Sequence, residues 1–266
     1  MIVTRFAPSP TGLLHLGHAF AAITAAESGY DFLLRIEDLD RGRSRDDFIE
    51  AIYLDLKWLG LSWDEPVLRQ SRRGDAYARA LERLTAMGLT YPCVCTRKHI
   101  ADEIARAGEA QHGPDGPLYP GTCRRLIAAP QDRSHVLRLD AAKAAVLAGP
   151  LSLREHGKVE HVDPLRFGDI VLARKDLPAA YHLAVVVDDA HQGVTLVTRG
   201  EDLAPATHVQ RLLQALLGLP EPGYAHHRLV LDQDGKKFSK RDQSVTLTAL
   251  RESGATPSDV RAMLAL

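Results

Sequence analysis

Apolar residues recur along the first ninety positions with two different periods. Short apolar runs at residues 2–7 and 32–36 predict buried strands. A loop rich in proline and glycine at residues 8–12 interrupts the first run. Strands that alternate with helices favour a parallel sheet with helices on its faces, so we expect an α/β fold. The segments with helical spacing are residues 15–26, 45–59 and 75–87.

The second half of the chain returns to this alternation after a long interruption. Apolar runs at residues 182–187 and 194–198 predict further strands, and residues 208–217 predict a helix. Residues 92–178 show no clean alternation, and we expect them to be an insertion that splits the first domain. The expected units are a catalytic domain at 1–91 and 179–232, the insertion at 92–178, and a terminal part at 233–266 with short helices at 247–253 and 257–266.

The composition is ordinary and excludes few classes of protein. Hydrophobic residues make up 45% of the 266 residues and charged residues make up 25%, as in a typical globular protein. No apolar run is long enough to span a bilayer, and the N-terminus lacks the layout of an export signal. We therefore expect a cytoplasmic protein with no membrane partner.

Arginines are concentrated locally, although the formal net charge is only −1. Any binding to a polyanion must therefore come from local patches, and backbone phosphates of a nucleic acid would accept contacts from several of them. Most surface arginines are simply solvated, so the sequence does not select among them. The local groups are Arg41, Arg43 and Arg45, then Arg69, Arg72 and Arg73, and finally Arg124 and Arg125.

A histidine motif lies where the first loop meets the first helix. His15 and His18 are three residues apart, so both side chains lie on one side of the first helical turn. The backbone N–H groups and the positive end of a helix dipole make this a natural seat for phosphate, to which imidazoles can donate. Gly17 removes a side chain where a flat ring would clash. Taken alone, a surface helix that begins with two histidines is the simpler interpretation.

A lysine-rich motif near the end of the chain makes a functional interpretation of the histidine motif the better one. Residues 232–235 predict a tight turn, and residues 236–241 (KKFSKR) place four cations in six positions. Such a run of basic residues usually forms a solvated loop. Lysines there could also stabilise the negative charge of pyrophosphate as it leaves. Together the two motifs predict one ATP site in an enzyme that activates a carboxylic acid. The expected catalytic residues are His15, His18 and Lys240, and Gly17, Lys237 and Ser239 join them in binding ATP.

These motifs, with three others, resemble the glutamyl-tRNA synthetase branch of the class I aminoacyl-tRNA synthetases. The resemblance rests on RFAPSPTG at 5–12, HLGH at 15–18, RIEDLD at 35–40, RGEDL at 199–203 and KFSKR at 237–241. Only 25 residues follow Arg241, whereas this branch continues into an anticodon-binding region. The short layout, with cysteines in the insertion, resembles the glutamyl-queuosine tRNA(Asp) synthetase family. It implies a Rossmann-like nucleotide-binding domain, an inserted zinc-bearing subdomain, and no anticodon-binding domain.

The same resemblance implies a glutamate site. Arg5 and Ser9 match the family's glutamate-binding loop. The guanidinium of an arginine can bind a carboxylate through two parallel hydrogen bonds. Glu37 matches the acidic residue that holds the α-amino group. Tyr181 and Arg199 match two further contacts, although a core tyrosine is an alternative for Tyr181. The implied glutamate-binding residues are Arg5, Phe6, Ala7, Pro8, Ser9, Glu37, Tyr181 and Arg199.

The three cysteines suggest a metal site in the insertion. Cys93 and Cys95 are two apart and face the same way on an extended segment, and Cys123 follows on a later loop. Three thiolates leave one tetrahedral zinc position to fill, while three reduced cysteines without metal are the alternative. On general grounds a histidine, His99 or His112, would be the better fourth ligand. The resemblance instead implies Tyr119, and one structural zinc per chain.

The resemblance also implies the reaction. Glutamate would be activated by ATP, with Mg²⁺ on the phosphates, as glutamyl-adenylate without tRNA. It would then be transferred to queuosine in the anticodon loop of tRNA(Asp) by a monomer. A compact glutamyl-tRNA synthetase that charges a tRNA 3′ end is the main alternative. A small-molecule ligase or nucleotidyltransferase, and a non-catalytic zinc-bearing RNA-binding module, are two others.

Overall fold

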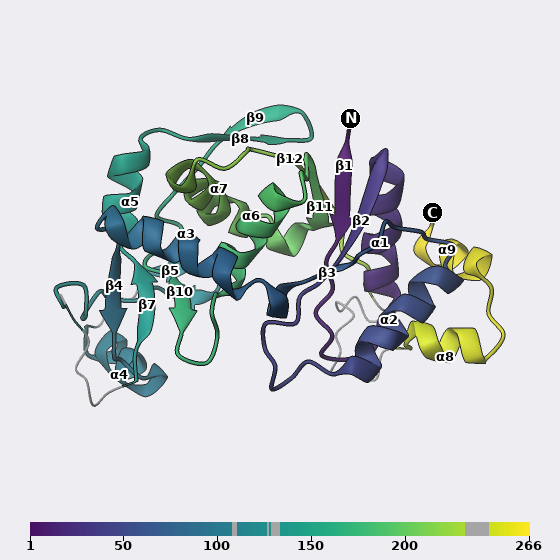
Figure 1. The fold of residues 1–266 in the computed structure, drawn as a ribbon, viewed down its shortest axis with the longest axis horizontal. Coiled ribbons are helices and arrows are strands. Elements are labelled where there is room, and N and C mark those ends of the chain that lie inside the picture. Colours follow the sequence, from purple (N-terminus) through teal and green to yellow (C-terminus); the bar gives the residue numbers. More distant parts are fainter. Residues whose placement is uncertain (108–110, 127, 129–133, 232–244) are drawn as a thin grey trace.

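Parallel strands from both halves of the chain lie at the centre of the molecule (Figure 1). The computed structural model describes residues 1–107, 111–126, 128, 134–231 and 245–266. One sheet has the order β1-β2-β3 and another the order β11-β12-β8-β9, and all pairs except β8–β9 are parallel. The Thr195 amide donates to Val3 O (3.0 Å), so β1 lies beside β11. These strands are β1 (Val3–Phe6), β2 (Asp31–Ile36), β3 (Leu68–Arg69), β8 (Ser152–Glu155), β9 (Lys158–His161), β11 (Leu196–Gly200) and β12 (Gly223–His227).

One hydrophobic cluster packs four helices around β1 and β2. The helix α1 (Leu16–Ser28) buries Ala19, Phe20, Ala22 and Ile23 in this cluster and ends at Gly29, as its sequence predicts. Small alanines let the helix lie close to the strands. The other helices of this cluster are α2 (Asp46–Trp58), α8 (Leu247–Glu252) and α9 (Pro257–Leu264).

A second cluster contains four helices of the other half. The helix α7 (Ala206–Leu217) lies at its centre, because it buries a face of valine and leucine residues against α6 and α5. The remaining helices of this cluster are α3 (Gly74–Ala86), α5 (Ala141–Ala148) and α6 (Tyr181–His191).

A search of the described residues for a membrane-spanning helix finds no helix with the necessary length and hydropathy.

The prediction of a strand at residues 182–187 is wrong. These residues lie in α6, whose Leu183, Ala184, Val185 and Val186 are all buried. A helix that is buried on most sides has no polar stripe, so its apolar run has the appearance of a buried strand. The β-branched valines strengthened that false signal.

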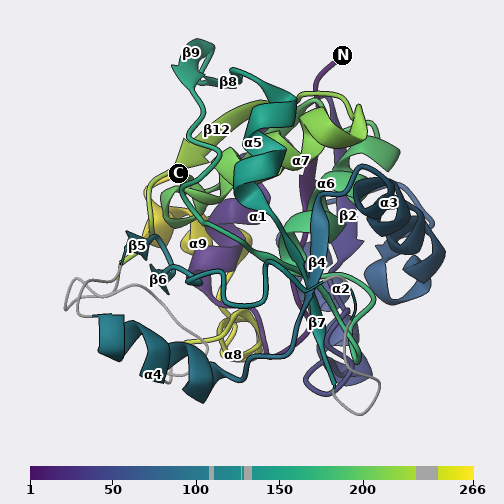
Figure 2. The same cartoon turned by 90° about the vertical axis from the view of Figure 1, so that its left-hand side faces the viewer.

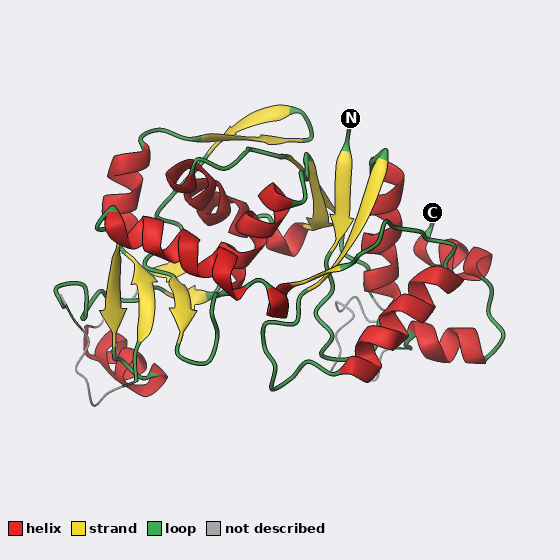
Figure 3. Cartoon of the chain, viewed as in Figure 1, coloured by secondary structure: helices red, strands yellow, loops and turns green. Residues whose placement is uncertain are grey.

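A small antiparallel sheet, most of which lies in residues 92–178, is set apart from the central strands (Figure 3). It has the order β10-β7-β4, and its end strand β4 leads into α4. In Figure 2 the β8–β9 hairpin projects at the top and α4 lies at the opposite end. Because β8 pairs with β12, this segment is also tied to the central strands; the division into domains stays a prediction. The elements are β4 (Thr90–Cys93), α4 (Arg97–Ala107), β5 (His112–Gly113), β6 (Gly116–Pro117), β7 (Val136–Leu139) and β10 (Val171–Arg174).

Candidate functional site

The histidine motif caps the first helix with its own imidazoles. Nδ1 of His15 accepts from the Gly17 amide (3.1 Å), and Nδ1 of His18 accepts from the His15 amide (3.2 Å). The two rings lie against each other, with centroids 3.8 Å apart. A nitrogen that accepts a hydrogen bond is unprotonated, so each neutral ring carries its proton on Nε2. A Cβ at Gly17 would come within 3.1 Å of the His15 ring, so glycine lets the cap close.

Both histidines border a cavity of about 370 Å³. The cavity lies at the carboxyl ends of β11 and β12, where ligands bind in open parallel sheets. The 3-10 turn η2 (Glu201–Leu203), which follows β11, forms one of its walls. The lining residues are His15, Gly17, His18, Ala21, Gly200, Asp202, Leu203, His227, Arg228, Leu229 and Val230.

The lysine motif lies in residues 232–244, which are outside the described part of the chain. Lys237, Ser239 and Lys240 therefore keep the roles predicted for them. The described residues on either side of this segment both lie at the histidine motif. Val230 lines the cavity, and Thr246 forms a β-bridge with His15.

A second, larger cavity of about 870 Å³ adjoins the first. Tyr181 and His182, at the start of α6, contribute to its wall, and Asp202 and Leu203 line both cavities. A molecule in the larger cavity would therefore lie next to one in the histidine cavity. Burial, with a smaller effect of Arg199, lowers the pKa of His182 to about 4, so its ring is neutral at physiological pH.

Two arginines and two carboxylates form a buried network next to the first loop. Asp189 Oδ1 accepts from Nε of Arg5 (3.0 Å) and from Nη1 of Arg35 (2.7 Å), and Arg35 Nη2 lies 3.4 Å from Oε1 of Glu37. Although burial acts in the opposite direction, the charges of Arg5 and Arg35 lower the pKa of Asp189. Burial raises the pKa of Glu37, which the two arginines only partly offset. Two positive and two negative charges therefore balance inside the protein.

The loop after β1 lies alongside Glu37. The Glu37 amide donates to Pro8 O (3.0 Å), which brings the backbone of the loop to the end of β2. The Phe6 side chain is buried in the hydrophobic cluster around α1, whereas Ala7 is partly exposed and Ser9 is exposed. Arg5 uses three N–H groups on Asp189 and on Thr198 O, so two of the five N–H groups of its guanidinium lie outside these contacts.

Arg199 is buried among uncharged partners. Its Nη2 donates to Oγ1 of Thr207 (2.7 Å), its Nη1 to Oε1 of Gln210 (2.9 Å) and its Nε to Nε2 of His226 (3.1 Å). Its Nη1 also lies 3.5 Å from Oη of Tyr181. Within the described residues Arg199 forms no ion pair, although its side chain is only 6% exposed. A buried cation without an anionic partner is costly unless a ligand supplies one.

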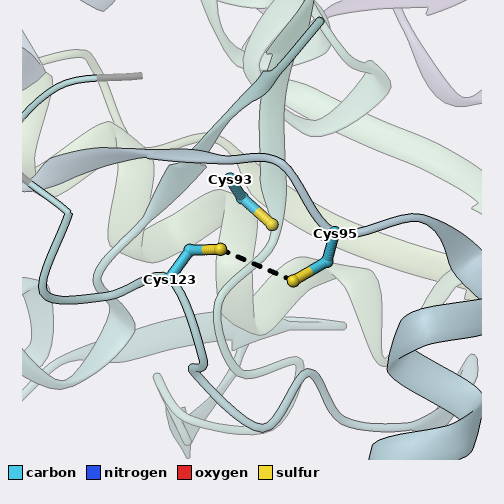
Figure 4. Close-up of side chains that lie close together, drawn as sticks. All are labelled: Cys93, Cys95 and Cys123. Atoms are coloured by element: carbon cyan, nitrogen blue, oxygen red, sulfur yellow. Dashed lines mark hydrogen bonds between the residues drawn. The ribbon is translucent and has the colours of Figure 1, made fainter. Parts of the chain in front are cut away.

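The three cysteines lie together beside the small antiparallel sheet (Figure 4). Their sulfur atoms all lie within 4.8 Å of one another, so the three residues could hold a metal ion. Sγ of Cys95 and Sγ of Cys123 are 3.5 Å apart. Neither His99 nor His112 belongs to this group among the described residues, and His112 instead lines the larger cavity.

Tyr119 adds a fourth donor to the cysteine group. Its Oη lies 3.3 Å from Sγ of Cys93 and 3.5 Å from Sγ of Cys95, so the donors fit a four-coordinate ion. The Arg138 guanidinium lies over its ring, 3.9 Å from the centroid. Although burial acts the other way, hydrogen bonding to Tyr119 and Arg138 lowers the pKa of Cys93, whereas burial raises the pKa of Cys95 to about 11.

Sequence reasoning missed the residues that hold the arginines in place. Asp189 and Arg35 were not singled out, although a pair of aspartates at the end of an apolar run is itself unusual in a buried segment. Gln210 and Thr207, which hold Arg199, lie on the buried face of α7. A polar residue on an otherwise apolar helix face was the signal that could have identified them.

Comparison with known proteins agrees with this arrangement. Over residues 1–266 the sequence matches the family described as tRNA synthetases class I (E and Q), catalytic domain. It is 47% identical to the glutamyl-Q tRNA(Asp) synthetase of Rhodobacter capsulatus, with 100% of both chains covered. It is 46% identical to that of Nocardia farcinica, covering 98% of this chain and 82% of the relative.

A solved structure shares both fold and family. The glutamate-tRNA synthetase of Elizabethkingia anophelis superposes with a TM-score of 0.73 at 30% identity and covers 91% of this chain. This chain spans 53% of that synthetase. The parallel-sheet fold with histidines at its ligand edge is thus that of a class I aminoacyl-tRNA synthetase, and the protein is an enzyme, a ligase. The chain belongs to the family of class I tRNA synthetases (E and Q), which confirms the resemblance seen in its motifs.

Proposed function

We propose that the enzyme activates L-glutamate with ATP to glutamyl-adenylate in the absence of tRNA. It then transfers the glutamate to queuosine in the anticodon loop of tRNA(Asp). The observation that carries the first step is the buried Arg199, which has no carboxylate partner among the described residues and lies next to Tyr181 at the larger cavity. Full-length similarity to two proteins named glutamyl-Q tRNA(Asp) synthetase supports the second step.

The charges at the site complement those of glutamate. Glutamate carries two carboxylates and one ammonium group. Arg199, and the two N–H groups of Arg5 outside its present contacts, are suited to the carboxylates. The Glu37 carboxylate is suited to the ammonium group, with the backbone of residues 6–9 beside it. Burial in a low-dielectric region strengthens each of these interactions.

The histidine cavity would hold the ATP phosphates. The glutamate α-carboxylate attacks the α-phosphorus, and pyrophosphate leaves. The Nε2–H groups of His15 and His18, and the N-terminus of α1, stabilise the charge that develops on the phosphate oxygens. Lys237, Ser239 and Lys240 would complete this environment from residues 232–244. Mg²⁺, when bound to the phosphates, would neutralise part of their charge.

The metal site would hold one structural zinc ion. Three thiolates and a phenol oxygen, from Cys93, Cys95, Cys123 and Tyr119, match a tetrahedral ion in number and proximity. The zinc would join β4 to the loop that carries Cys123. Its place beside the small antiparallel sheet, outside the linings of the two cavities, supports a structural role.

Transfer of labelled glutamate to tRNA tests the proposed function. We expect labelling of purified tRNA(Asp) that carries queuosine and none of tRNA(Asp) that lacks it. A hydroxyl of the modified base attacks the acyl carbon of the adenylate, and AMP leaves. Removal of the 3′-terminal adenosine should not prevent labelling, because the acceptor lies in the anticodon loop.

A compact glutamyl-tRNA synthetase is the second candidate. The structural similarity to the Elizabethkingia anophelis synthetase favours it, because that protein shares the fold over 91% of this chain. This candidate requires an intact 3′ end and no queuosine. Labelling that follows the 3′ adenosine, rather than the modified base, would favour it over the primary proposal.

A further inference from the structure

Most of the arginines in the two clusters at residues 41–45 and 69–73 are neutralised by carboxylates. Four of the six form an ion pair with an aspartate, and two of these aspartates, Asp38 and Asp188, are buried. An arginine that is paired with a carboxylate attracts an anionic ligand less strongly. The four pairs are Arg43–Asp40 (2.6 Å), Arg45–Asp47 (2.7 Å), Arg69–Asp38 (2.9 Å) and Arg73–Asp188 (2.7 Å).

The other two arginines, Arg41 and Arg72, belong to segments that contact each other. Both are exposed, and neither forms an ion pair with any residue that the structure describes. Nη2 of Arg41 donates to Ser71 O (3.4 Å), which places the guanidinium of the first cluster against the residue that precedes Arg72. Two exposed arginines from separate parts of the sequence are therefore carried by adjoining segments of the surface.

The buried carboxylate of Asp38 joins the two segments that carry Arg41 and Arg72. Asp38, which is only 2% exposed, accepts from the Ser71 amide (2.8 Å) and from the Ser71 hydroxyl (2.7 Å). It also accepts from Nε of Arg69 (2.9 Å). The 3-10 turn η1 (Gln70–Arg72) is thus fixed to the loop that follows β2. A pair of arginines on a fixed frame loses less entropy when it binds a ligand.

The segments that carry the pair adjoin the buried network of Arg5, Arg35, Glu37 and Asp189. Arg41 is four residues beyond Glu37, in the connection between β2 and α2 that runs along the lower centre of Figure 1. On the other side, Gln70 in η1 donates to Asp188 (2.9 Å), the neighbour of Asp189. A polyanion that contacts the pair would pass close to the residues that we propose to bind glutamate.

We propose that Arg41 and Arg72 form a phosphate-binding pair for the RNA backbone of the tRNA substrate. Guanidinium groups bind phosphate oxygens in a bidentate way, and backbone phosphates position an RNA without reading its sequence. This inference rests on the proposed function, since it assumes a tRNA whose acceptor nucleotide reaches the glutamate site. The pair fixes the approach of the RNA, and the residues around the cavities recognise the nucleotide.

The test compares Arg41→Ala, Arg72→Ala and the double variant with Arg45→Ala. Arg45 is a matched control, because it is an exposed arginine of the same loop whose guanidinium is held by both oxygens of Asp47. The affinity for tRNA(Asp) is measured at several salt concentrations. We expect each single variant to bind about fivefold more weakly, as for the loss of an exposed ion pair of roughly 1 kcal/mol. Each should lower the slope of log K against log salt by about 0.7.

The outcomes separate the RNA proposal from its alternatives. Glutamate-dependent pyrophosphate exchange without RNA should be unchanged in the double variant. If the KM for ATP in that exchange rises while tRNA binding stays as in the parent, the pair serves the nucleotide and the RNA proposal is wrong. Equal weakening by Arg45→Ala, or no weakening by the double variant, also overturns it.

Two further controls keep the test decisive. Arg41→Gln and Arg72→Gln replace the alanine variants if those fail to fold, which urea unfolding would show. A parent protein that binds tRNA but transfers no glutamate would contradict the proposed function alone, because the binding comparison between variants still tests the pair. A parent that binds no tRNA overturns the proposal of a phosphate-binding pair.

Discussion

At the scale of single residues, the two motif histidines combine a structural and a chemical role. Each imidazole uses Nδ1 to accept a backbone N–H at the start of α1, and this leaves the proton on Nε2. The cap therefore sets the tautomer that a phosphate oxygen needs. A residue that only caps the helix and a residue that only binds phosphate can be told apart by substitution.

His15→Asn separates these two roles. Asparagine is a good N-cap residue, so we expect the free energy of unfolding to change by less than about 0.5 kcal/mol. The variant lacks Nε2–H, and adenylate formation should fall by about 100-fold or more. His15→Ala should lose activity to the same extent and also about 1 kcal/mol of stability. Urea unfolding and pyrophosphate exchange measure the two effects, and an active His15→Asn variant would contradict the phosphate role.

Asp189 is the residue on which the buried charges depend. Asp189→Asn keeps the shape but removes the carboxylate that Arg5 and Arg35 share, so that only the Arg35–Glu37 pair remains. We expect a loss of about 3–5 kcal/mol in the free energy of unfolding, because a buried charge loses its partner. Asp47→Asn, which breaks the exposed pair with Arg45, is the control and should cost less than about 1 kcal/mol. Similar losses in the two variants would show that Asp189 has no special role.

The difference between these residues explains how much of the site the sequence could predict. His15 and His18 lie in one short motif, and their spacing already placed both on one turn of a helix. Asp189 acquires its role from Arg5 and Arg35, which are more than 150 positions away. No local pattern records which distant charge will meet a buried carboxylate, so sequence reasoning could not find it.

At the scale of elements, local periodicity predicted those helices that have one polar face. Both α2 and α3 lie within one or two residues of their predicted limits because each has exposed charged positions. The helix α6 was mistaken for a strand because burial on most sides removed that contrast. The strand β12 was not predicted, since its five residues, Gly223–His227, contain only one buried side chain.

The metal site joins elements that periodicity does not connect, and zinc removal tests it. We expect the parent to contain one zinc ion per chain, and Cys93→Ser to lose it together with part of its thermal stability. Tyr119→Phe retains the ring and the three thiolates but not the fourth donor, so its zinc affinity should fall about 10- to 100-fold. Elemental analysis and competition with a chelator measure these changes. A parent without zinc would contradict the structural metal.

At the scale of the whole molecule, three partly buried histidines make stability depend on pH. Burial lowers the pKa of His182 to about 4, and it also lowers the pKa of His208 and His226. Between the unfolded pKa of about 6.5 and the folded value, the unfolded chain binds more protons than the folded chain. The free energy of unfolding should therefore be greatest above that range and fall as the pH drops from 6.5 towards 4.

His182→Gln removes the largest of these contributions. Below pH 6.5 the variant should lose stability more gradually than the parent, by up to about 1.4 kcal/mol per pH unit. Urea unfolding at pH 7.5, 6, 5 and 4.5 gives the two profiles. Parallel profiles over this range would show that His182 titrates normally in the folded protein.

The proposed function requires one ATP site that works with glutamate and without RNA. Glutamate-dependent exchange of labelled pyrophosphate into ATP, measured with the purified enzyme after ribonuclease treatment, tests this most directly. We expect exchange that requires glutamate, proceeds without tRNA, and is lost in both His15→Asn and Lys240→Ala. Exchange that appears only after tRNA is added, or that survives both substitutions, would contradict it.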